Sequence, residues 1–467
     1  MSLFYLISFL LFHPNYCATK KYTNYTLYRG VPVNKSHLDF FNSLSEMFDV
    51  NFWTPPGSLY KPIDFVLAPG DKKVFLKMAE EYDVYLSTLI ADVQRAFDMQ
   101  RVKSYIRRNL GSFDWNDFYR INDIYNWLKD LKDKYPEFVK VESIGTTYEK
   151  RPILAVHVTL PGSKLRSKVI VEGGIHAREW IGPCFVTYML QQILDSPKSN
   201  NSNLKDIALT YEWFFVPVLN PDGYEYTHTN NRLWRKNRNN EYGVDLNRNF
   251  DHAFGNIVPD RECFDTTTVR SAVGVSFSHY EETYCGAKAF SEKETIAMSN
   301  FVRNHSNHLE YYLAFHSYGQ AMILPYANTR AHMENFDTVA AMAKQAADHI
   351  ALRYNTRYVY GTAYDTVGYV TSGVSGCWVK ETFSVPYVLT FELPDRGQYG
   401  FALPNEKITP TCIETMDGVL SLLKPRTKIY DKLRHEHRGF DDGQRTKFLD
   451  KLVILFNVCL FVIARFD

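Results

Sequence analysis

The sequence has few cysteines, almost no net charge and few long apolar runs, and each of these shortages argues against a class of protein. It has 7 cysteines in 467 residues and no Cys-x-x-Cys pair, which argues against a thiolate zinc site and a dithiol redox motif. Because 53 Lys and Arg balance 52 Asp and Glu, neither nucleic acid nor an anionic membrane is expected as a partner. With 45% hydrophobic residues, the chain can fill a large core, and its length suggests two or three domains.

The two ends of the chain carry short apolar runs. The run from Leu3 to Phe12 is too short to span a bilayer and predicts a signal peptide over residues 1–17. Four Asn-x-Ser/Thr acceptor motifs agree with a secreted, extracellular glycoprotein; they begin at Asn24, Asn34, Asn200 and Asn304. A charged tail at 426–467 ends in the apolar run 452–464, which fits either a lipid-anchor signal or a tail of no function. Membrane attachment is expected only in the first case.

The cysteines suggest one disulfide in a secreted chain. Cys17 leaves with the predicted signal peptide, whereas Cys263 and Cys285 flank a polar, loop-like segment and are the best candidates for a bridge. Cys184 and Cys412 are expected to be buried as small apolar side chains.

The first hundred residues after the leader predict a small domain. Between residues 22 and 91, strand-like and helix-like runs follow one another in the order β-α-β-β-α-β, which indicates a split βαβ domain. A charged helix is then expected over Asp92–Arg108, with basic residues concentrated at its end. Such a linker is an attractive target for trypsin-like proteases.

From Asp114 onward, helical patterns alternate with apolar strands for some 300 residues, which predicts a mixed α/β sheet covered by helices on both faces. Sites in such sheets lie at the carboxyl ends of strands. His176, His316 and Glu392 all stand at the ends of predicted strands.

The motif His176-Ala177-Arg178-Glu179 follows one of these strands. A catalytic zinc ion takes three protein ligands and leaves one position for water, and a His₂Glu set is one of its standard solutions. The motif offers one histidine and one glutamate, so a second histidine must come from elsewhere. Alone, it could equally be a surface ion pair, because so short a pattern arises by chance.

Six strings together make the interpretation specific. They are His176-Ala177-Arg178-Glu179-Trp180-Ile181, Pro221-Asp222-Gly223-Tyr224, Asn231-Arg232-Leu233-Trp234-Arg235-Lys236, Asp245-Leu246-Asn247-Arg248-Asn249-Phe250, Phe315-His316-Ser317-Tyr318 and Thr390-Phe391-Glu392-Leu393. In this order the chain resembles the zinc metallocarboxypeptidases of the pancreatic A/B type, the procarboxypeptidases or funnelins, through about Pro425. The resemblance implies a mixed eight-stranded sheet preceded by a small ferredoxin-like α+β prodomain. It also implies a prosegment over 18–108 and a catalytic domain over 109–425.

The resemblance assigns the reacting groups. His316 would complete the zinc site with His176 and Glu179, and Asp245 would accept the free ring N–H of the first histidine. Glu392 would be the general base that deprotonates the attacking water and returns the proton to the leaving amine. Arg235 would stabilise the oxyanion that forms on the scissile carbonyl.

Further residues are implied as substrate contacts. Asn247 and Arg248 would bind the terminal carboxylate, which would make the enzyme an exopeptidase. Tyr369 would cover that carboxylate; counting back from Trp378 gives this residue, whereas counting forward from Tyr358 gives Gly368. The auxiliary members of the substrate funnel would be Arg178, Arg232, Ser317 and Tyr318.

The specificity-determining position of the family falls on Gly376, which supplies neither charge nor bulk. With Ile323, Ala327 and Ala363 nearby, a roomy neutral pocket favours aromatic or large aliphatic C-terminal residues. If Asp365, in the lengthened loop, points inward, a basic preference returns.

The sequence therefore predicts a secreted, monomeric zymogen with one zinc ion per chain, activated by a trypsin-like protease and acting on peptide and protein C-termini. The alternative from another class is a non-catalytic extracellular module that grips C-terminal tails; losses at the zinc or base positions would favour it. The segment 254–285 is longer than the family's usual connection, and no role is assigned to it.

Overall fold

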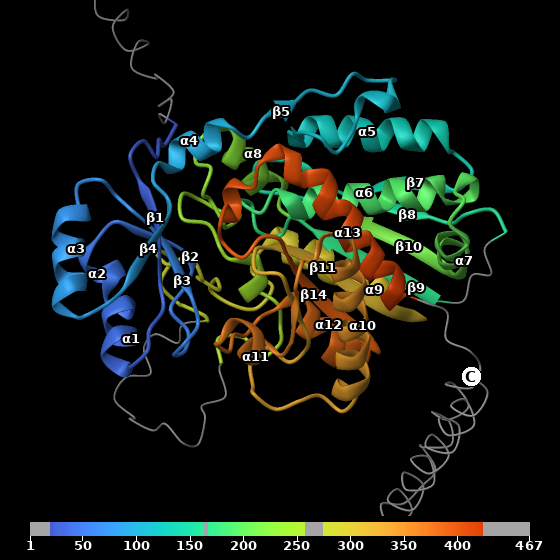
Figure 1. The fold of residues 1–467 in the computed structure, drawn as a ribbon. Helices are drawn as coiled ribbons and strands as arrows, with labels where there is room; N and C mark the ends of the chain where they lie inside the picture. The colour runs from blue at the N-terminus through green and yellow to red at the C-terminus, as the bar shows by residue number, and fades with distance from the viewer. Residues whose placement is uncertain (1–18, 163–166, 257–273, 424–467) are drawn as a thin grey trace, which may run out of the picture. The chain divides into compact units, whose positions relative to one another are not determined.

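The computed structural model describes residues 19–162, 167–256 and 274–423, which form a four-stranded and an eight-stranded sheet with helices around them (Figure 1). The predicted leader at 1–17, the tail at 426–467 and Cys263 lie outside these ranges. The leader, the anchor and the Cys263–Cys285 bridge therefore stay predictions. Within the described ranges, no helix is long and apolar enough to cross a membrane.

The N-terminal module has the predicted β-α-β-β-α-β order. Its elements are β1 (Thr26–Gly30), α1 (Lys35–Asn42), α2 (Leu44–Met47), β2 (Val50–Thr54), β3 (Ile63–Leu67), α3 (Lys72–Glu81) and β4 (Leu86–Ile90). The strands lie in the order β2-β3-β1-β4 and pair antiparallel. Figure 1 shows the three helices on one face of this sheet. The predicted ferredoxin-like prodomain is confirmed.

Aromatic side chains fill the space between these helices and the sheet. Phe40 and Phe41 of α1, Phe65 of β3 and Phe75 of α3 are all buried in one cluster. Helix α1 begins where the side chain of Asn34 accepts a hydrogen bond from the N–H of His37, so an N-cap fixes its start.

The linker differs from the sequence-based expectation. A helix was expected over residues 92–108, but α4 (Val93–Asp98) ends ten residues earlier. The Nε2 group of Gln100 donates to two backbone carbonyls at 3.1 and 3.0 Å, and the N–H of Arg101 donates to Asn405 at 2.8 Å. The chain then forms β5 (Val102–Lys103), which pairs with β6 (Phe118–Tyr119). These long-range hydrogen bonds outweigh the local helical preference, because propensity is a weak prior against tertiary contacts.

The larger sheet has eight strands in the order β13-β12-β14-β11-β9-β10-β8-β7. Strands β9, β10, β11 and β14 form the parallel centre, and β7, β8 and β12 add antiparallel pairings. The strands are β7 (Val139–Thr146), β8 (Pro152–Val158), β9 (Ser167–Gly173), β10 (Tyr211–Val216), β11 (Leu309–Ser317), β12 (Ala321–Ile323), β13 (Val359–Gly361) and β14 (Tyr387–Leu393). The mixed eight-stranded sheet is therefore confirmed.

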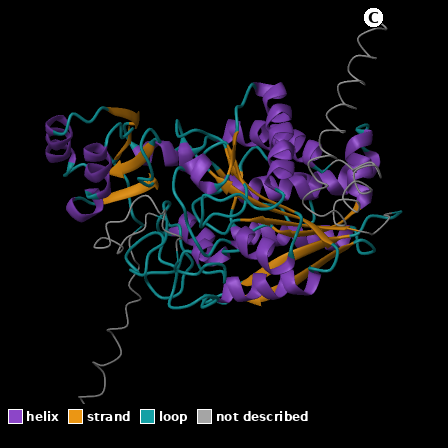
Figure 2. Cartoon of the chain, turned by 90° about the horizontal axis from the view of Figure 1, so that it is seen from below, coloured by secondary structure: helices purple, strands orange, loops and turns teal. Residues whose placement is uncertain are grey.

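Helices cover both faces of this sheet, as Figure 2 shows. The helices are α5 (Ile121–Lys134), α6 (Ile181–Asp195), α7 (Ser202–Thr210), α8 (Pro221–Thr229), α9 (Lys293–His305), α10 (Phe336–Tyr354), α11 (Ala363–Val367), α12 (Ser375–Phe383) and α13 (Ile408–Leu422). Phe301 of α9 and Trp378 of α12 share a buried cluster with Phe214 of β10 and Tyr312 of β11. Cys184 of α6 and Cys412 of α13 are buried, as predicted.

Candidate active site

The three predicted metal ligands come from two neighbouring strands. His316 is the penultimate residue of β11, and His176 and Glu179 lie in the loop between β9 and α6. Because β9 and β11 pair in parallel, their carboxyl ends lie side by side and deliver the three side chains to one place. All three side chains are buried.

The donor atoms of this group converge. The Nδ1 atom of His176 lies 2.8 Å from Oε1 of Glu179 and 3.1 Å from Nδ1 of His316. The other carboxylate oxygen of Glu179 lies 3.2 Å from Nδ1 of His316 and accepts the N–H of Ser317 at 3.2 Å. Two imidazole nitrogens and a carboxylate, all within 4.8 Å of one another, match the His₂Glu donor set of a catalytic zinc ion. The residues present therefore fit zinc.

Asp245 connects the first histidine to an arginine. Its Oδ1 atom accepts a hydrogen bond from Nε2 of His176 at 3.1 Å, and its Oδ2 atom accepts two from Arg235 at 3.0 and 2.9 Å. Burial alone would raise the pKa of Asp245, but Arg235, Arg248 and His176 hold this pKa well below its usual range. Because His176 donates from Nε2, its Nδ1 presents a lone pair to the ligand group, as metal binding requires.

Glu392 and Arg235 border the ligand group. Glu392 lies in β14, in register with His316 on the adjacent strand β11. Burial raises the pKa of Glu392 to about 8, against the opposing effect of His316. The Nη1 atom of Arg235 lies 3.6 Å from Oε1 of Glu179. A carboxyl group and a fixed cation therefore flank the metal group, and attack of water on a carbonyl needs both kinds of group.

Asn247 and Arg248 lie beside these groups in the short 3₁₀ turn η3 (Leu246–Arg248). The side-chain oxygen of Asn247 accepts the N–H of Ser375 at 2.9 Å, which leaves its NH₂ group as the donor for a ligand. The guanidinium of Arg248 donates from Nη1 to the carbonyl of Asn247 at 2.9 Å and from Nε to the carbonyl of Gly274. These bonds fix the plane of the guanidinium before any substrate arrives.

Tyr369 lies near the same cations. Gly368 is the C-cap of α11, with a left-handed φ of 85° that favours glycine, and Tyr369 follows it. Burial raises the pKa of Tyr369, whereas the neighbouring charges of Arg248 and Arg235 lower this pKa. The N-terminal module reaches this ring, because a Cβ atom built on Gly57 would lie 3.1 Å from Cδ1 of Tyr369.

Gly376 is the second residue of α12 and faces β14. A Cβ atom at this position would lie 3.0 Å from Cγ1 of Val388 and 3.7 Å from Oγ1 of Thr390. The next residue, Cys377, belongs to an apolar cluster together with Ile323, Tyr326, Ala327, Ala363, Val367 and Val374. Ile323, Ala327 and Ala363, which the sequence grouped with Gly376, thus lie in one apolar cluster next to α12.

Asp365 does not share that environment. It is the third residue of α11, and its Oδ2 atom accepts the N–H and the hydroxyl of Thr362 at 2.9 and 2.8 Å. Together the two side chains form a capping box. The carboxylate of Asp365 is thus engaged by the N-terminus of its own helix.

Two predicted substrate contacts are occupied by the N-terminal module. Arg178 donates to the side chain of Asn51 and to the carbonyl of Phe52, both at 3.2 Å. The hydroxyl of Tyr318 donates to Asp64 at 2.8 Å. Strands β2 and β3 of the module therefore cover residues that were assigned to the substrate funnel.

Arg232 is used differently from the expectation. Its three donor groups bind the side chain of Gln100 at 2.9 Å, the carbonyl of Arg178 at 2.9 Å and the carbonyl of Phe401 at 2.5 Å. The guanidinium also stacks on Trp180 at 3.6 Å. These contacts use three of the five guanidinium N–H groups, and through them Arg232 supports the backbone around Arg178 in this conformation.

Asp64 is a functional residue that the sequence analysis missed. It is fully buried and pairs with Arg29, whose Nε lies 2.6 Å from Oδ1. Arg29 also donates to the carbonyl of Arg396 across the boundary between the modules, at 2.5 Å. The available signal was an acidic residue inside the otherwise apolar strand Ile63–Leu67, since a buried charge needs partners.

Comparisons with known proteins agree with this geometry. A family model described as zinc carboxypeptidase matches residues 124–418, and one described as carboxypeptidase activation peptide matches residues 28–100. Zinc carboxypeptidase A 1 of Anopheles gambiae is 35% identical over 412 residues, which cover 86% of this chain and 90% of that protein. Human carboxypeptidase O is 34% identical over 363 residues, which cover 77% of this chain and 90% of that protein.

Solved structures share the fold. The crystal structure of thrombin activatable fibrinolysis inhibitor superposes with a TM-score of 0.77 at 26% identity, covering 86% of this chain and 98% of that chain. Carboxypeptidase A from Helicoverpa armigera superposes with a TM-score of 0.72 at 21% identity, covering 86% and 97%. With a family model that matches more than half of its length, the chain belongs to the zinc carboxypeptidase family: it is a metallocarboxypeptidase with one zinc ion and an activation peptide.

Proposed function

We propose that the enzyme removes the last residue of peptides and proteins and that Glu392, Arg235, Asn247, Arg248 and Tyr369 do this work. The observation that carries the proposal is the arrangement around the metal group. Glu392 is in register with the ligand His316, and Arg235 lies next to the ligand Glu179. Arg248, whose guanidinium is held by backbone carbonyls, is the second arginine of the site.

Each side chain has a defined role in the proposed reaction. A bound zinc ion would supply Lewis-acid activation of the scissile carbonyl and would lower the pKa of a water molecule. Glu392 takes the proton of the attacking water on its carboxylate and then gives it to the leaving amine. Arg235, which Asp245 holds with two hydrogen bonds, stabilises the negative charge on the carbonyl oxygen.

The terminal carboxylate of the substrate provides the positional selectivity. Arg248 donates to this carboxylate as a charged fork, the NH₂ group of Asn247 adds a neutral donor, and the hydroxyl of Tyr369 covers it. An internal peptide segment has no carboxylate at this point and leaves the buried cation without a partner, which is costly. The reaction is therefore that of an exopeptidase.

We further propose that neutral side chains are preferred at the substrate's last position. Gly376 brings no charge into the pocket, and the neighbouring cluster around Cys377 is apolar. The alternative basic preference required an inward-facing Asp365, and this carboxylate caps α11 instead. An apolar pocket without a counter-charge favours aromatic and large aliphatic side chains.

Replacing Gly376 by Asp tests this preference. We expect the ratio of kcat/KM for C-terminal Lys to that for C-terminal Phe to rise on the order of 10²-fold, because the new carboxylate would pair with an ammonium group in a desolvated pocket. The backbone of Gly376 has no left-handed φ, and a new Cβ would lie 3.0 Å from Cγ1 of the buried Val388, which must shift by a few tenths of an ångström. The measurement is a screen of peptides that differ only in their last residue.

Gly376→Asn is the matched control, since it adds the same volume without the charge. We expect it to lower the rate on Phe without raising the rate on Lys. If the wild-type enzyme already prefers Lys or Arg in the same screen, the neutral preference is wrong.

We propose secretion and activation by a trypsin-like protease, with domain bounds at 1–17, 18–108, 109–425 and 426–467 for leader, prosegment, enzyme and tail. The four predicted glycosylation sites support secretion, because Asn24, Asn34, Asn200 and Asn304 are all exposed. Activation requires loss of the module whose strands now contact Arg178 and Tyr318.

Replacing Asp245 by Asn is expected to weaken zinc binding by about 10- to 100-fold, which is the usual effect of removing a carboxylate behind a ligand histidine. The amide cannot serve Nε2 of His176 and Arg235 as a charged acceptor. Equilibrium dialysis against zinc buffers measures the affinity. Asp251→Asn, an exposed change of equal size in the same loop, is expected to bind zinc normally, and equal affinities for both variants would contradict the role of Asp245.

A further inference from the structure

The basic residues of the activation linker differ in how they are held. The backbone of Arg101 is bonded on both sides, since its N–H donates to Asn405 and its carbonyl accepts the N–H of Phe118, and Lys103 belongs to the paired strand β5. Arg107 and Arg108 instead lie in an exposed turn after β5. Endoproteases need exposed backbone that is not paired in a sheet, so the bonds next to Arg107 and Arg108 are the accessible ones.

Asp130 of helix α5 is the anchor of this turn. Its Oδ2 atom accepts the backbone N–H of Arg108 at 2.5 Å and the hydroxyl of Tyr105 at 2.8 Å, and its Oδ1 atom lies 3.6 Å from Nε of Arg107. The side chain of Asp130 is only 5% exposed. One buried carboxylate of the enzyme therefore holds three groups from the linker.

We propose that activation cleaves the Arg107–Arg108 bond and that Asp130 receives the new N-terminus. A trypsin-like protease adds one water across this amide: the C–N bond breaks, Arg107 keeps a carboxylate, and the nitrogen of Arg108 becomes an ammonium group. That nitrogen already donates to Asp130, so a hydrogen bond becomes an ion pair in place. Cleavage one bond later would leave Arg108 on the departing prosegment, so Asp130 would lose all three linker groups. This inference rests on the proposed activation by cleavage.

The exchange of partners at Asp130 favours this product. When the prosegment leaves, Tyr105 and Arg107 leave with it. Their departure removes one hydrogen bond and one ion pair from the Asp130 carboxylate. An ammonium group brings three N–H donors and a positive charge to the same oxygen atoms, and thereby replaces both lost contacts.

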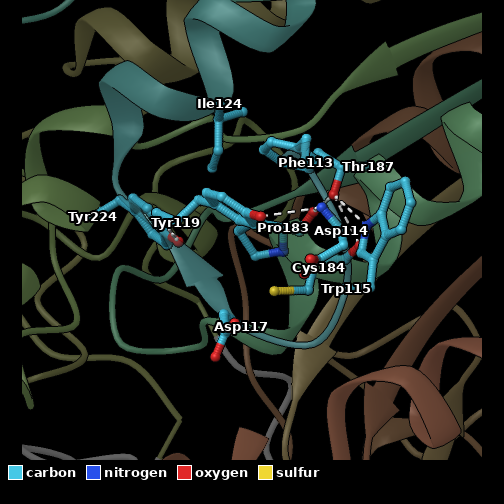
Figure 3. Close-up of a pocket in the computed structure, with 10 residues that line it drawn as sticks. All are labelled: Phe113, Asp114, Trp115, Asp117, Tyr119, Ile124, Pro183, Cys184, Thr187 and Tyr224. Atoms are coloured by element: carbon cyan, nitrogen blue, oxygen red, sulfur yellow. Dashed lines mark hydrogen bonds between the residues drawn. The ribbon is translucent and has the colours of Figure 1, made fainter. Parts of the chain in front are cut away.

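The chain just after the cleaved bond packs against the enzyme around a small cavity of about 10 Å³. Figure 3 shows the residues that line this cavity. Phe113 stacks on Tyr119 at 4.2 Å between ring centres, the N–H of Asp114 donates to the hydroxyl of Tyr119 at 3.0 Å, and Nε1 of Trp115 donates to Thr187 at 3.2 Å. The new terminus is therefore only a few residues from a fixed point, so docking it on Asp130 orders little additional chain.

The ion pair has a pH signature that the zymogen lacks. An unperturbed α-amino group has a pKa of about 7.7 to 8.0, and the charge of Asp130 raises it in the folded enzyme. The ion pair therefore stabilises the folded enzyme fully below about pH 7.7. This stabilisation is lost as the pH rises through the higher pKa that the α-amino group has in the folded enzyme. The other charged groups facing this point are Arg107 and Tyr105 on the linker and Asp123 on α5, whose Oδ1 accepts the N–H of Tyr105. Burial raises the pKa of Tyr105 above its usual value. Tyr105 and Arg107 leave with the prosegment, so of these groups only Asp123 remains in the processed enzyme.

The test uses the full-length proenzyme before and after trypsin treatment, as wild type and as Asp130→Asn. N-terminal sequencing of the large product is expected to begin at Arg108. At pH 7 the processed Asp130→Asn variant is expected to melt about 3 °C below processed wild type, and this gap narrows at pH 9.5. In the uncleaved proteins, the difference in melting temperature between wild type and Asp130→Asn is expected to be the same at both pH values.

Asp133→Asn is the matched control, because Asp133 is exposed on the same helix; it should leave both melting temperatures unchanged. If Asp130→Asn does not fold, the wild type alone suffices: processed enzyme must lose stability relative to zymogen between pH 7 and pH 9.5. A first residue other than Arg108, or a gap independent of pH, overturns the inference. Failure of trypsin to raise peptidase activity speaks instead against the proposed activation.

Discussion

Glu392→Gln is expected to lower kcat on a blocked peptide substrate by about 10³-fold or more, while one zinc ion per chain stays bound. General acid–base groups contribute about 10²- to 10⁴-fold, and Glu392 is proposed to act twice, on the attacking water and on the leaving amine. Glutamine has the same shape but cannot take up a proton. Steady-state kinetics together with metal analysis of the same sample measure both quantities.

The site explains why the metal should survive this substitution. The ligands come from β11 and from the loop after β9, whereas Glu392 belongs to β14. Glu406→Gln, an exposed change of the same kind, serves as the control and should turn over normally. Unchanged turnover in Glu392→Gln with zinc present would refute the proposed base. Loss of zinc would instead show that the side chain supports the ligand group.

The resemblance to the zinc carboxypeptidases assigned the metal group in the sequence, and local and topological rules agree with that assignment. His176, His316 and Glu392 each stand at the carboxyl end of an apolar run, and parallel strands bring such ends together. The alternation of apolar strands and helices predicted the sheet for the same reason. The ends of strands and the alternation of strands with helices can both be inferred from the hydrophobic periodicity of a single sequence.

The errors fall where long-range contacts decide. Residues 99–108 have a helical composition, but Gln100 and Arg101 bind the backbone near Phe401 and the side chain of Asn405, some 300 residues away. The contacts of Arg232 could not be predicted either, because its donors meet carbonyls whose positions only the folded chain defines.

The resemblance implies that the N-terminal domain covers the funnel, but the residues that make the contacts could not be predicted. Asn51 and Phe52 contact Arg178 through one amide oxygen and one backbone carbonyl, and neither group has a sequence signature. What the sequence did contain was the buried acid Asp64, whose two partners are Arg29 of the same module and Tyr318 of the enzyme. An acidic residue in a fully buried strand indicates a partner but not which one.

Arg248→Ala is expected to lower kcat/KM on peptides with a free C-terminal carboxylate by about 10²- to 10³-fold, because truncating one partner of a buried, hydrogen-bonded charge pair costs about 2–5 kcal/mol. On the same peptides with an amidated C-terminus, which carry no charge for the guanidinium to bind, the loss should be less than about tenfold. The measurement is the ratio of the two kcat/KM values in wild type and variant.

Arg248→Lys separates charge from geometry. A lysine keeps the positive charge but lacks the planar fork, so we expect it to recover part of the rate on free-acid substrates and to leave a measurable deficit. Arg357→Ala, an exposed arginine, should leave the ratio unchanged. Equal losses of kcat/KM on both peptides in Arg248→Ala would contradict carboxylate binding.

Arg248 also faces Asp245, at 3.9 Å, but Asp245 keeps its two hydrogen bonds from Arg235 in the variant. The ligand histidine should therefore stay oriented, and the loss should be confined to substrates with a terminal carboxylate.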